Sequence, residues 1–160
     1  MELLKKMCGI HAPSGEEDAM NQFLLKYIKD NQKSWLTTPI IHSGDGFQEN
    51  IILVFGDEPR TAIFAHMDSI GFTVRYGNEL VKLGGPKIAS GTKLVGEDSK
   101  GTIETELLCN DDTKKISYVL NREIDRGTNL TFKPNWREDD DFIQNCYMDN
   151  RLGVWNALKV

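Results

Sequence analysis

Hydrophobic positions near the start of the chain follow helical spacing. Residues 2–8 predict a short helix that ends at Gly9. Ser14–Glu17 then has the S-x-x-E pattern of a capping box, in which the serine and glutamate side chains bond the free amides of a helix start. The acidic pair Glu16–Glu17 suits the positive end of a helix dipole. Apolar residues at helical intervals predict an amphipathic helix to about Asn31, formed by Met20, Phe23, Leu24, Tyr27 and Ile28.

From Trp35 onward, the pattern changes to short apolar runs of the kind that form strands. These runs are Ser34–Ile41, Asn50–Phe55 and Thr61–Ala65. The last two are continuously apolar rather than alternating, which is typical of strands covered on both faces. A helix followed by such strands predicts an α/β layered domain, with His66 at the C-terminal end of a buried strand.

Residues 72–145 differ, because their apolar runs are short and separated by frequent turns. The runs are FTVRY, ELVKL, TIETELL, KISYVL and TNLTF. No helical periodicity of useful length interrupts them, so this region predicts a small all-β module. The acidic run Glu138–Asp141 is most simply a solvated loop where that module ends.

Helical spacing returns at Leu152, Trp155 and Leu158, with Asp149 or Asn150 as the predicted N-cap. An α/β pattern that resumes after a β module indicates an insertion rather than two domains in series. The predicted parts are the first part of an α/β domain (1–71), an inserted β domain (72–145) and the α/β domain resuming (146–160). The chain ends within the last predicted helix, so we expect the α/β domain to be truncated here.

Composition and charge argue against two classes of protein. The chain has 160 residues, of which 39% are hydrophobic, and a formal net charge of −5. A general nucleic-acid binder normally shows a basic face, so we expect no nucleic-acid partner. No apolar run approaches the roughly 20 residues of a membrane span. The start of the chain also lacks the apolar region of a signal peptide, so we expect no membrane partner.

The three cysteines are Cys8, Cys109 and Cys146, an odd number without a CxxC pair. This spacing argues against a disulfide framework or a structural zinc knuckle. We expect reduced thiols in a cytoplasmic protein. A catalytic cysteine is disfavoured because the sequence shows no accompanying His/Asn partner pattern.

His66 and Asp68 are the first candidates for chemistry. Side chains two residues apart on a strand point to the same side, and a carboxylate beside a histidine can fix the tautomer and orientation of a metal-binding ring. Alone, however, such a pair is more typical of structure, just as an aspartate at a helix start such as Asp149 is more typical of a cap. His11 and His42 lie in polar, turn-rich segments and are not expected to be ligands.

Four stretches resemble a known family: LLKKMCGIHAPSGEE, NIILVFG leading into TAIFAHMDSIGFTV, IDRGTNLTFKP, and CYMDNRLGVWNAL. The family is the glutamyl, or deblocking, aminopeptidases, cytoplasmic enzymes with two metal ions that include large tetrahedral forms. Some members have been labelled endoglucanases. The resemblance spans essentially the whole chain but only about the N-terminal half of a typical member. Its specific part is AHMDSIGF followed by MDNRLG at this separation.

The resemblance implies a three-layer, phosphorylase/hydrolase-like α/β aminopeptidase domain, incomplete here, with an inserted all-β barrel-like domain that carries subunit contacts. It also implies two divalent ions, zinc or cobalt. His66 would be a ligand of one ion, and Asp149 would bridge both. Asp68 would act in catalysis by holding His66 and supporting its basicity. The Asp149–Asn150 peptide would be cis.

Two departures from the family pattern matter. Family members usually have Glu where this chain has Ser69. The catalytic Glu, the adjacent Glu ligand, another acidic ligand and a final His lie downstream of the matched part. Glu16–Glu17 cannot replace them, because this pair precedes the first strand. We therefore expect these 160 residues to bind metal weakly and to hydrolyse nothing.

Three functions remain as alternatives. The first is the N-terminal portion of a metal-dependent aminopeptidase that removes N-terminal residues from peptides and forms a homo-oligomer through the inserted domain. The second is a non-catalytic fragment or remnant that acts only through that assembly domain. The third is an unrelated α/β protein in which His66 and Asp149 are structural.

Overall fold

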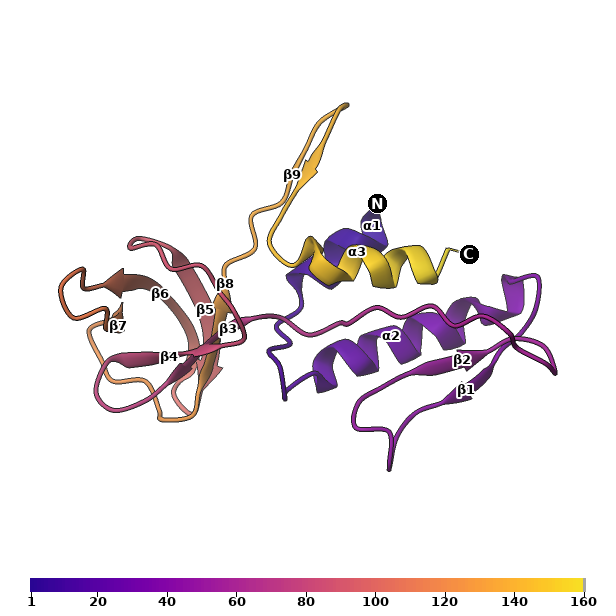
Figure 1. The fold of residues 1–160 in the computed structure, drawn as a ribbon, viewed down its shortest axis with the longest axis horizontal. Helices are drawn as coiled ribbons and strands as arrows, with labels where there is room; N and C mark the ends of the chain where they lie inside the picture. The colour runs from indigo at the N-terminus through magenta and orange to yellow at the C-terminus, as the bar shows by residue number, and fades with distance from the viewer. Residues whose placement is uncertain (160) are drawn as a thin grey trace.

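The computed structural model describes residues 1–159 and has two parts, a helical part and a β-barrel (Figure 1). The helices are α1 (Glu2–Gly9), α2 (Asp18–Asn31) and α3 (Met148–Ala157), and a 3-10 turn, η1 (Gln32–Ser34), follows α2. A hairpin of two short strands, β1 (Ile40–His42) and β2 (Ile52–Val54), belongs to the helical part. A second small hairpin, β9 (Arg137–Glu138) and β10 (Ile143–Gln144), leads from the barrel to α3. The acidic run begins at the end of β9 and continues into the turn of this hairpin.

The helical part is held together by apolar side chains from both ends of the chain. Helices α1 and α3 lie side by side in Figure 1, although more than 130 positions separate them in the sequence. The buried core residues come from α1, α2 and the segment between them, and are Leu4, Met7, Cys8, Ala12, Met20 and Leu24. Partly buried side chains of α3 and of the residue after it pack against this core, namely Met148, Val154, Trp155 and Leu158. The sequence correctly predicts α1 and α2, since the apolar stripe of each helix is the face that is buried.

The predicted capping box at Ser14–Glu17 is wrong. Helix α2 begins at Asp18, its N-cap residue is Glu17, and no side chain caps it. The Glu17 carboxylate instead accepts a hydrogen bond from the Gly15 amide at 2.7 Å. The hydroxyl of Ser14 bonds to a residue far along the chain, and this tertiary contact prevails over the local pattern.

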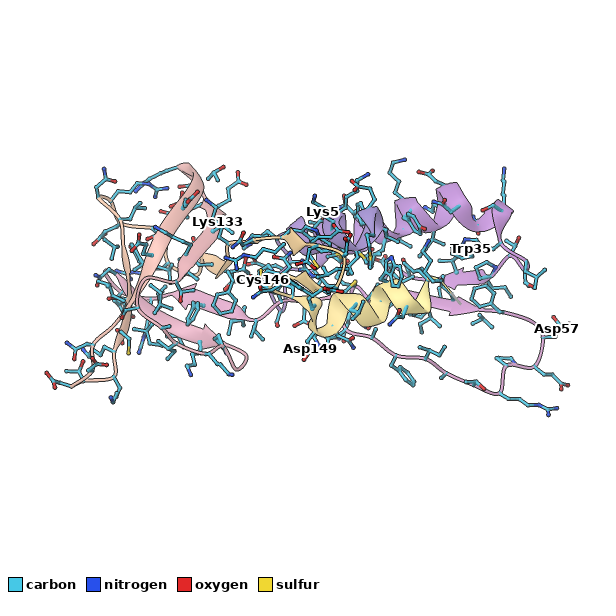
Figure 2. All side chains as sticks on the ribbon, turned by 90° about the horizontal axis from the view of Figure 1, so that it is seen from above. Lys5, Trp35, Asp57, Lys133, Cys146 and Asp149 are labelled. Carbon is cyan, nitrogen blue, oxygen red and sulfur yellow. The ribbon has the colours of Figure 1, made fainter. Side chains whose placement is uncertain are left out.

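The predicted buried strand at Thr61–Ala65 is also wrong. The segment is extended, but within residues 1–159 no backbone hydrogen bond joins residues 60–68 to another segment. Figure 2 shows the chain leaving Asp57 along one edge of the molecule with its side chains unpacked. Ile63 and Phe64 are 62% and 88% exposed. The apolar pattern calls for neighbours on both faces, and residues 1–159 supply none.

The other two predicted strands of the sheet are also shorter than predicted. Of Ser34–Ile41, only the last two residues enter a strand, and β2 is half-exposed rather than buried on both faces. The α/β sheet is thus represented here by one antiparallel hairpin. This matches an α/β domain that is incomplete over these residues.

The barrel is closed and entirely antiparallel, with strand order β3-β4-β7-β6-β5-β8. Its strands are β3 (Gly71–Val74), β4 (Glu79–Leu83), β5 (Lys93–Asp98), β6 (Gly101–Cys109), β7 (Ile116–Val119) and β8 (Asn129–Phe132). Alternate side chains point inward, as a period of two requires. Gly71 is needed where β3 meets β8, because a Cβ there would lie 2.4 Å from the Leu130 carbonyl oxygen.

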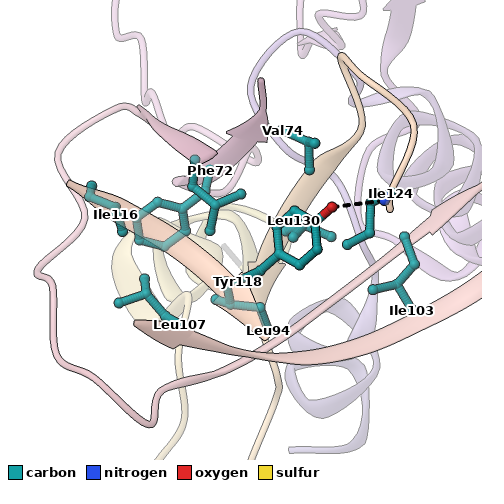
Figure 3. Packing of buried hydrophobic residues seen from close by; sticks show 10 residues of the cluster. Phe72, Val74, Leu94, Ile103, Leu107, Ile116, Tyr118, Ile124 and Leu130 are labelled. Carbon is teal, nitrogen blue, oxygen red and sulfur yellow. Dashed lines mark hydrogen bonds between the residues drawn. The ribbon is translucent and has the colours of Figure 1, made fainter. Parts of the chain in front are cut away.

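Ten buried residues fill the barrel, and Phe72, Leu94, Leu107 and Leu130 are fully buried among them (Figure 3). The dashed line in Figure 3 marks the hydrogen bond that the Ile124 amide donates to the Tyr118 hydroxyl at 2.8 Å. The barrel therefore has a core separate from that of the helices, and the predicted all-β barrel-like insertion is confirmed.

None of the helices formed by residues 1–159 is both long and apolar enough to span a membrane.

Candidate functional site

His66 lies on the extended segment before β3, and its imidazole is 51% exposed. The ring is placed between two carboxylates. Its Nδ1 is 2.9 Å from Oδ1 of Asp68, and its Nε2 is 3.2 Å from Oδ1 of Asp149. The structure thus brings together all three residues that the sequence singled out, although His66 is not on the buried strand that the pattern predicts.

The two contacts of His66 cannot both be ordinary hydrogen bonds of a neutral ring. A neutral imidazole has one N–H and one lone pair, whereas each carboxylate oxygen is an acceptor. If Nδ1–H donates to Asp68, the Nε2 lone pair faces the oxygen of Asp149. That arrangement is favourable when a cation lies between them, or when the ring is protonated and donates from both nitrogens. Nε2 of His66 and Oδ1 of Asp149 therefore form a site that favours a positive charge.

Asp149 reaches this site from the irregular start of α3. Its backbone is non-helical (φ −88°, ψ 105°), and so is that of Asn150, so regular helix begins at Arg151. The peptide between Asp149 and Asn150 is cis, as the resemblance implies. Asn150 therefore precedes the first regular residue, as predicted for an N-cap, but no side-chain hydrogen bond caps the helix. With no capping contact, the Asp149 side chain is 95% exposed and free to bind a ligand (Figure 2).

Gly153 supports this irregular start. A Cβ at Gly153 would lie 2.0 Å from the Asn150 side-chain oxygen, so only glycine leaves room for that amide. The position of Asn150, and with it that of Asp149, thus depends on a residue one helical turn later.

Asp68 holds the other side of the His66 ring. While Oδ1 faces Nδ1 of His66, Oδ2 accepts a hydrogen bond from the hydroxyl of Ser14. Both oxygens of the carboxylate are therefore engaged, and its plane is fixed. The sequence reading missed this role of Ser14, because S-x-x-E is a local signal and the contact spans 54 residues.

Arg151 is fully buried beneath the site. Its Nη1 donates to the carbonyls of Met7 at 2.6 Å and Ile10 at 2.9 Å, and its Nη2 donates to Oγ of Ser69 at 3.0 Å. Its guanidinium also lies 4.8 Å from the centre of the Tyr147 ring. Burial lowers the pKa of Arg151, and no salt bridge joins it to a carboxylate within residues 1–159. Ser69 thus accepts a hydrogen bond from the one side of the Arg151 guanidinium that faces the segment after Asp68.

The remaining histidines and the cysteines lie apart from His66. His11 bonds Oγ1 of Thr131 at 2.8 Å, and burial lowers its pKa. The rings of His42 and Phe47 lie 6.0 Å apart beside the first hairpin. The three cysteines are free thiols, and burial raises the pKa of Cys8 and Cys146. A raised pKa keeps a thiol protonated at neutral pH, which is the opposite of what a nucleophilic cysteine needs.

Comparisons with known proteins show the fold. No protein-family model and no curated protein matches the chain. Among solved structures, PhTET1-12s, a dodecamer in its asymmetric unit, is similar with a TM-score of 0.77 and 20% identity over 99% of this chain and 53% of that chain. A TET aminopeptidase from the marine sediment archaeon Thaumarchaeota archaeon SCGC AB-539-E09 gives 0.76 and 16% over 99% and 52%.

A third solved structure, described as a peptidase/endoglucanase, gives a TM-score of 0.62 and 19% identity over 99% of this chain and 54% of that chain. At these identities the likeness establishes the fold. The chain has the α/β aminopeptidase fold with its inserted barrel, and it spans about half the length of the solved structures that it matches.

Proposed function

We propose that this chain is one portion of a metal-dependent aminopeptidase that removes N-terminal residues from peptides. The observation that carries the proposal is the convergence of His66 Nε2 and Asp149 Oδ1 at 3.2 Å, with Asp68 behind the ring, in a fold shared with TET aminopeptidases. One imidazole and one exposed carboxylate suit a divalent ion such as zinc or cobalt.

The donor set fits such ions only in part. Catalytic zinc takes about three protein ligands and a water. No group of three metal-binding side chains occurs within residues 1–159. In the proposed enzyme, His66 and Asp149 bind the ions, and further polypeptide supplies the remaining ligands and the general base. When bound, a pair of such ions would lower the pKa of a shared water and stabilise the oxyanion of the peptide.

The chain's own residues prepare this site. Asp68 accepts the Nδ1–H of His66 and so keeps the Nε2 lone pair directed at the position of the ion. Asp149 projects from the irregular start of α3 with both oxygens accessible, as a carboxylate shared by two ions requires. The unpaired apolar segment 61–65 lies immediately before His66, so the polypeptide that would cover it would also reach the site.

Metal titration of the 160-residue chain tests the proposal. We expect weak binding of Co²⁺ or Zn²⁺, followed by cobalt absorption and calorimetry. Loss of a ligand should cost at least as much as loss of an outer partner, so His66→Ala and Asp149→Ala should each weaken binding by about 10-fold or more. His42→Ala is the matched control and should bind as the unaltered chain does.

Hydrolysis of aminoacyl-p-nitroanilides is the second readout. We expect none from the 160 residues alone, because the proposal assigns the general base to further polypeptide. Robust hydrolysis that His66→Ala abolishes would refute the incompleteness of the site. Equal metal affinity of the unaltered chain and His66→Ala would refute the site itself.

Assembly through the barrel is the second candidate function. Strands β4, β7 and β6 are neighbours in the barrel and expose apolar side chains on their outer faces, namely Val81, Val119 and Leu108. One similar structure is a dodecamer. We expect light scattering to give a mass several times the 18.1 kDa of one chain. A single species at 18.1 kDa, the mass of one chain, would count against a homo-oligomer.

A further inference from the structure

Ser14 lies in the turn between α1 and α2, and its hydroxyl is the donor to Oδ2 of Asp68. Among residues 1–159, this is the one side-chain hydrogen bond that Ser14 makes. The contact extends a chain of polar groups that runs from Ser14 through Asp68 and His66 to Asp149. The Ser14 hydroxyl is thus bonded to the same carboxylate, Asp68, that contacts the imidazole of His66.

The backbone holds Ser14 in place for this contact. The Ser69 amide donates to the Ala12 carbonyl at 2.8 Å, and the Ser14 amide donates to the Ser69 carbonyl at 3.2 Å. Pro13 and Ser69 form a parallel bridge between these bonds. Gly15 then turns the chain with φ 90°, a conformation that glycine adopts without strain. Ser14 is therefore fixed to the residue that follows Asp68.

We propose that Ser14 is a positioning residue that sets the tautomer of His66. A carboxylate without a bond to its second oxygen can turn about its Cβ–Cγ bond, and this turn moves both oxygens out of line with Nδ1 of His66. The Ser14 hydroxyl occupies Oδ2 and leaves Oδ1 as the acceptor for Nδ1–H. The proton then stays on Nδ1, and the Nε2 lone pair faces Asp149.

The effect of Ser14 on metal affinity rests on the proposed function, whereas its effect on the tautomer of His66 does not. Outer partners of a metal-binding histidine fix its tautomer and orientation, and their loss costs about 10–100-fold in affinity. The tautomer is measurable without metal, from the ¹⁵N shifts of the imidazole. The chain has three histidines, so the signals of His66 can be assigned by comparison with His66→Ala.

The test compares Ser14→Thr with Ser14→Val, which have nearly the same shape and differ in the hydroxyl. Spectra are recorded without metal at a fixed pH of about 8.5, two units above the ordinary histidine pKa. We expect the Nδ1–H form of His66 to predominate in the unaltered chain and in Ser14→Thr. In Ser14→Val and Ser14→Ala, its population should fall by about half or more, because Asp68 is free to turn.

Ser69→Ala is the control for simple loop packing. Its hydroxyl donates to the Ala12 carbonyl at 2.8 Å and joins the same two segments without touching Asp68. Asp68→Asn is the reference for a site without the carboxylate. The proposal is overturned if Ser14→Val keeps the His66 spectrum of the unaltered chain, or if Ser69→Ala changes that spectrum as Ser14→Val does.

Co²⁺ titration of the same variants separates this inference from the proposed function. We expect affinity to fall by about 10-fold in Ser14→Val and to change little in Ser14→Thr. If no variant binds metal but the tautomer follows the hydroxyl, the positioning role stands and the metal function fails. If metal affinity falls without a change of tautomer, the positioning role fails.

Discussion

Replacement of Arg151 by alanine is expected to lower the free energy of unfolding by about 3–5 kcal/mol, the cost typical of breaking a buried charged group's contacts or emptying a core site. The guanidinium is fully buried and donates to two main-chain carbonyls and to Ser69. Those carbonyls belong to Met7, in the last turn of α1, and to Ile10, which follows that helix, where a cation is favoured. Arg151 therefore ties the start of α3 to the end of α1.

A comparison of two variants separates lost hydrogen bonds from lost volume. Arg151→Met keeps most of the volume but leaves the Ile10 carbonyl without its donor. We expect a cost of about 1–3 kcal/mol, the penalty for leaving a buried polar group unpaired. Urea unfolding followed by circular dichroism measures both variants, and the exposed Arg137→Ala serves as control. If Arg151→Met proves more stable than the unaltered chain, desolvation of the charge outweighs its bonds.

The helices and the barrel strands could be predicted from the sequence because each buries its own apolar stripe against nearby partners. In β6, burial alternates along the strand over Ile103, Thr105 and Leu107, as a period of two predicts. The helical spacing in α2 places Met20, Leu24 and Ile28 on its buried face. In both cases, the pattern and the burial are properties of the same element.

Burial of residues 61–65 could not be predicted in this way. An apolar run indicates that a segment can be buried, but its burial also depends on neighbouring segments that cover it. Phe64 is consequently 88% exposed, although its local pattern is as apolar as that of any barrel strand. Ser14 shows the converse case, in which a tertiary acceptor replaces the local capping partner.

The candidate site could not be predicted from local sequence patterns alone. His66 and Asp149 are 83 residues apart, and each alone is more typical of structure. Their proximity follows from the fold, because α3 returns beside α1 after the barrel is complete. Arg151 and Ser14 stabilise that arrangement through long-range hydrogen bonds. The sequence patterns that contain them do not indicate these partners, because S-x-x-E is a local signal and the partners of Arg151 lie more than 80 residues away.

The second large expected effect is on stability, and it compares the buried Phe72 with the exposed Phe64. Phe72→Ala should cost about 3–5 kcal/mol of stability, because Phe72 is fully buried in the barrel core and packs edge-on against Phe132 at 5.9 Å. Phe64→Ala, eight residues earlier, is the matched control. Its side chain touches little, so the expected change is within about 0.5 kcal/mol.

Hydrogen exchange of the barrel amides measures the first effect, since the barrel has its own core and can open while the helices remain packed. Protection should fall throughout β3–β8 in Phe72→Ala and remain in Phe64→Ala. A cost for Phe64→Ala equal to that of Phe72→Ala would mean that segment 61–65 is covered in solution. In any longer polypeptide that completes the sheet, the same Phe64→Ala change should become as costly as Phe72→Ala, because burial then accompanies the apolar pattern.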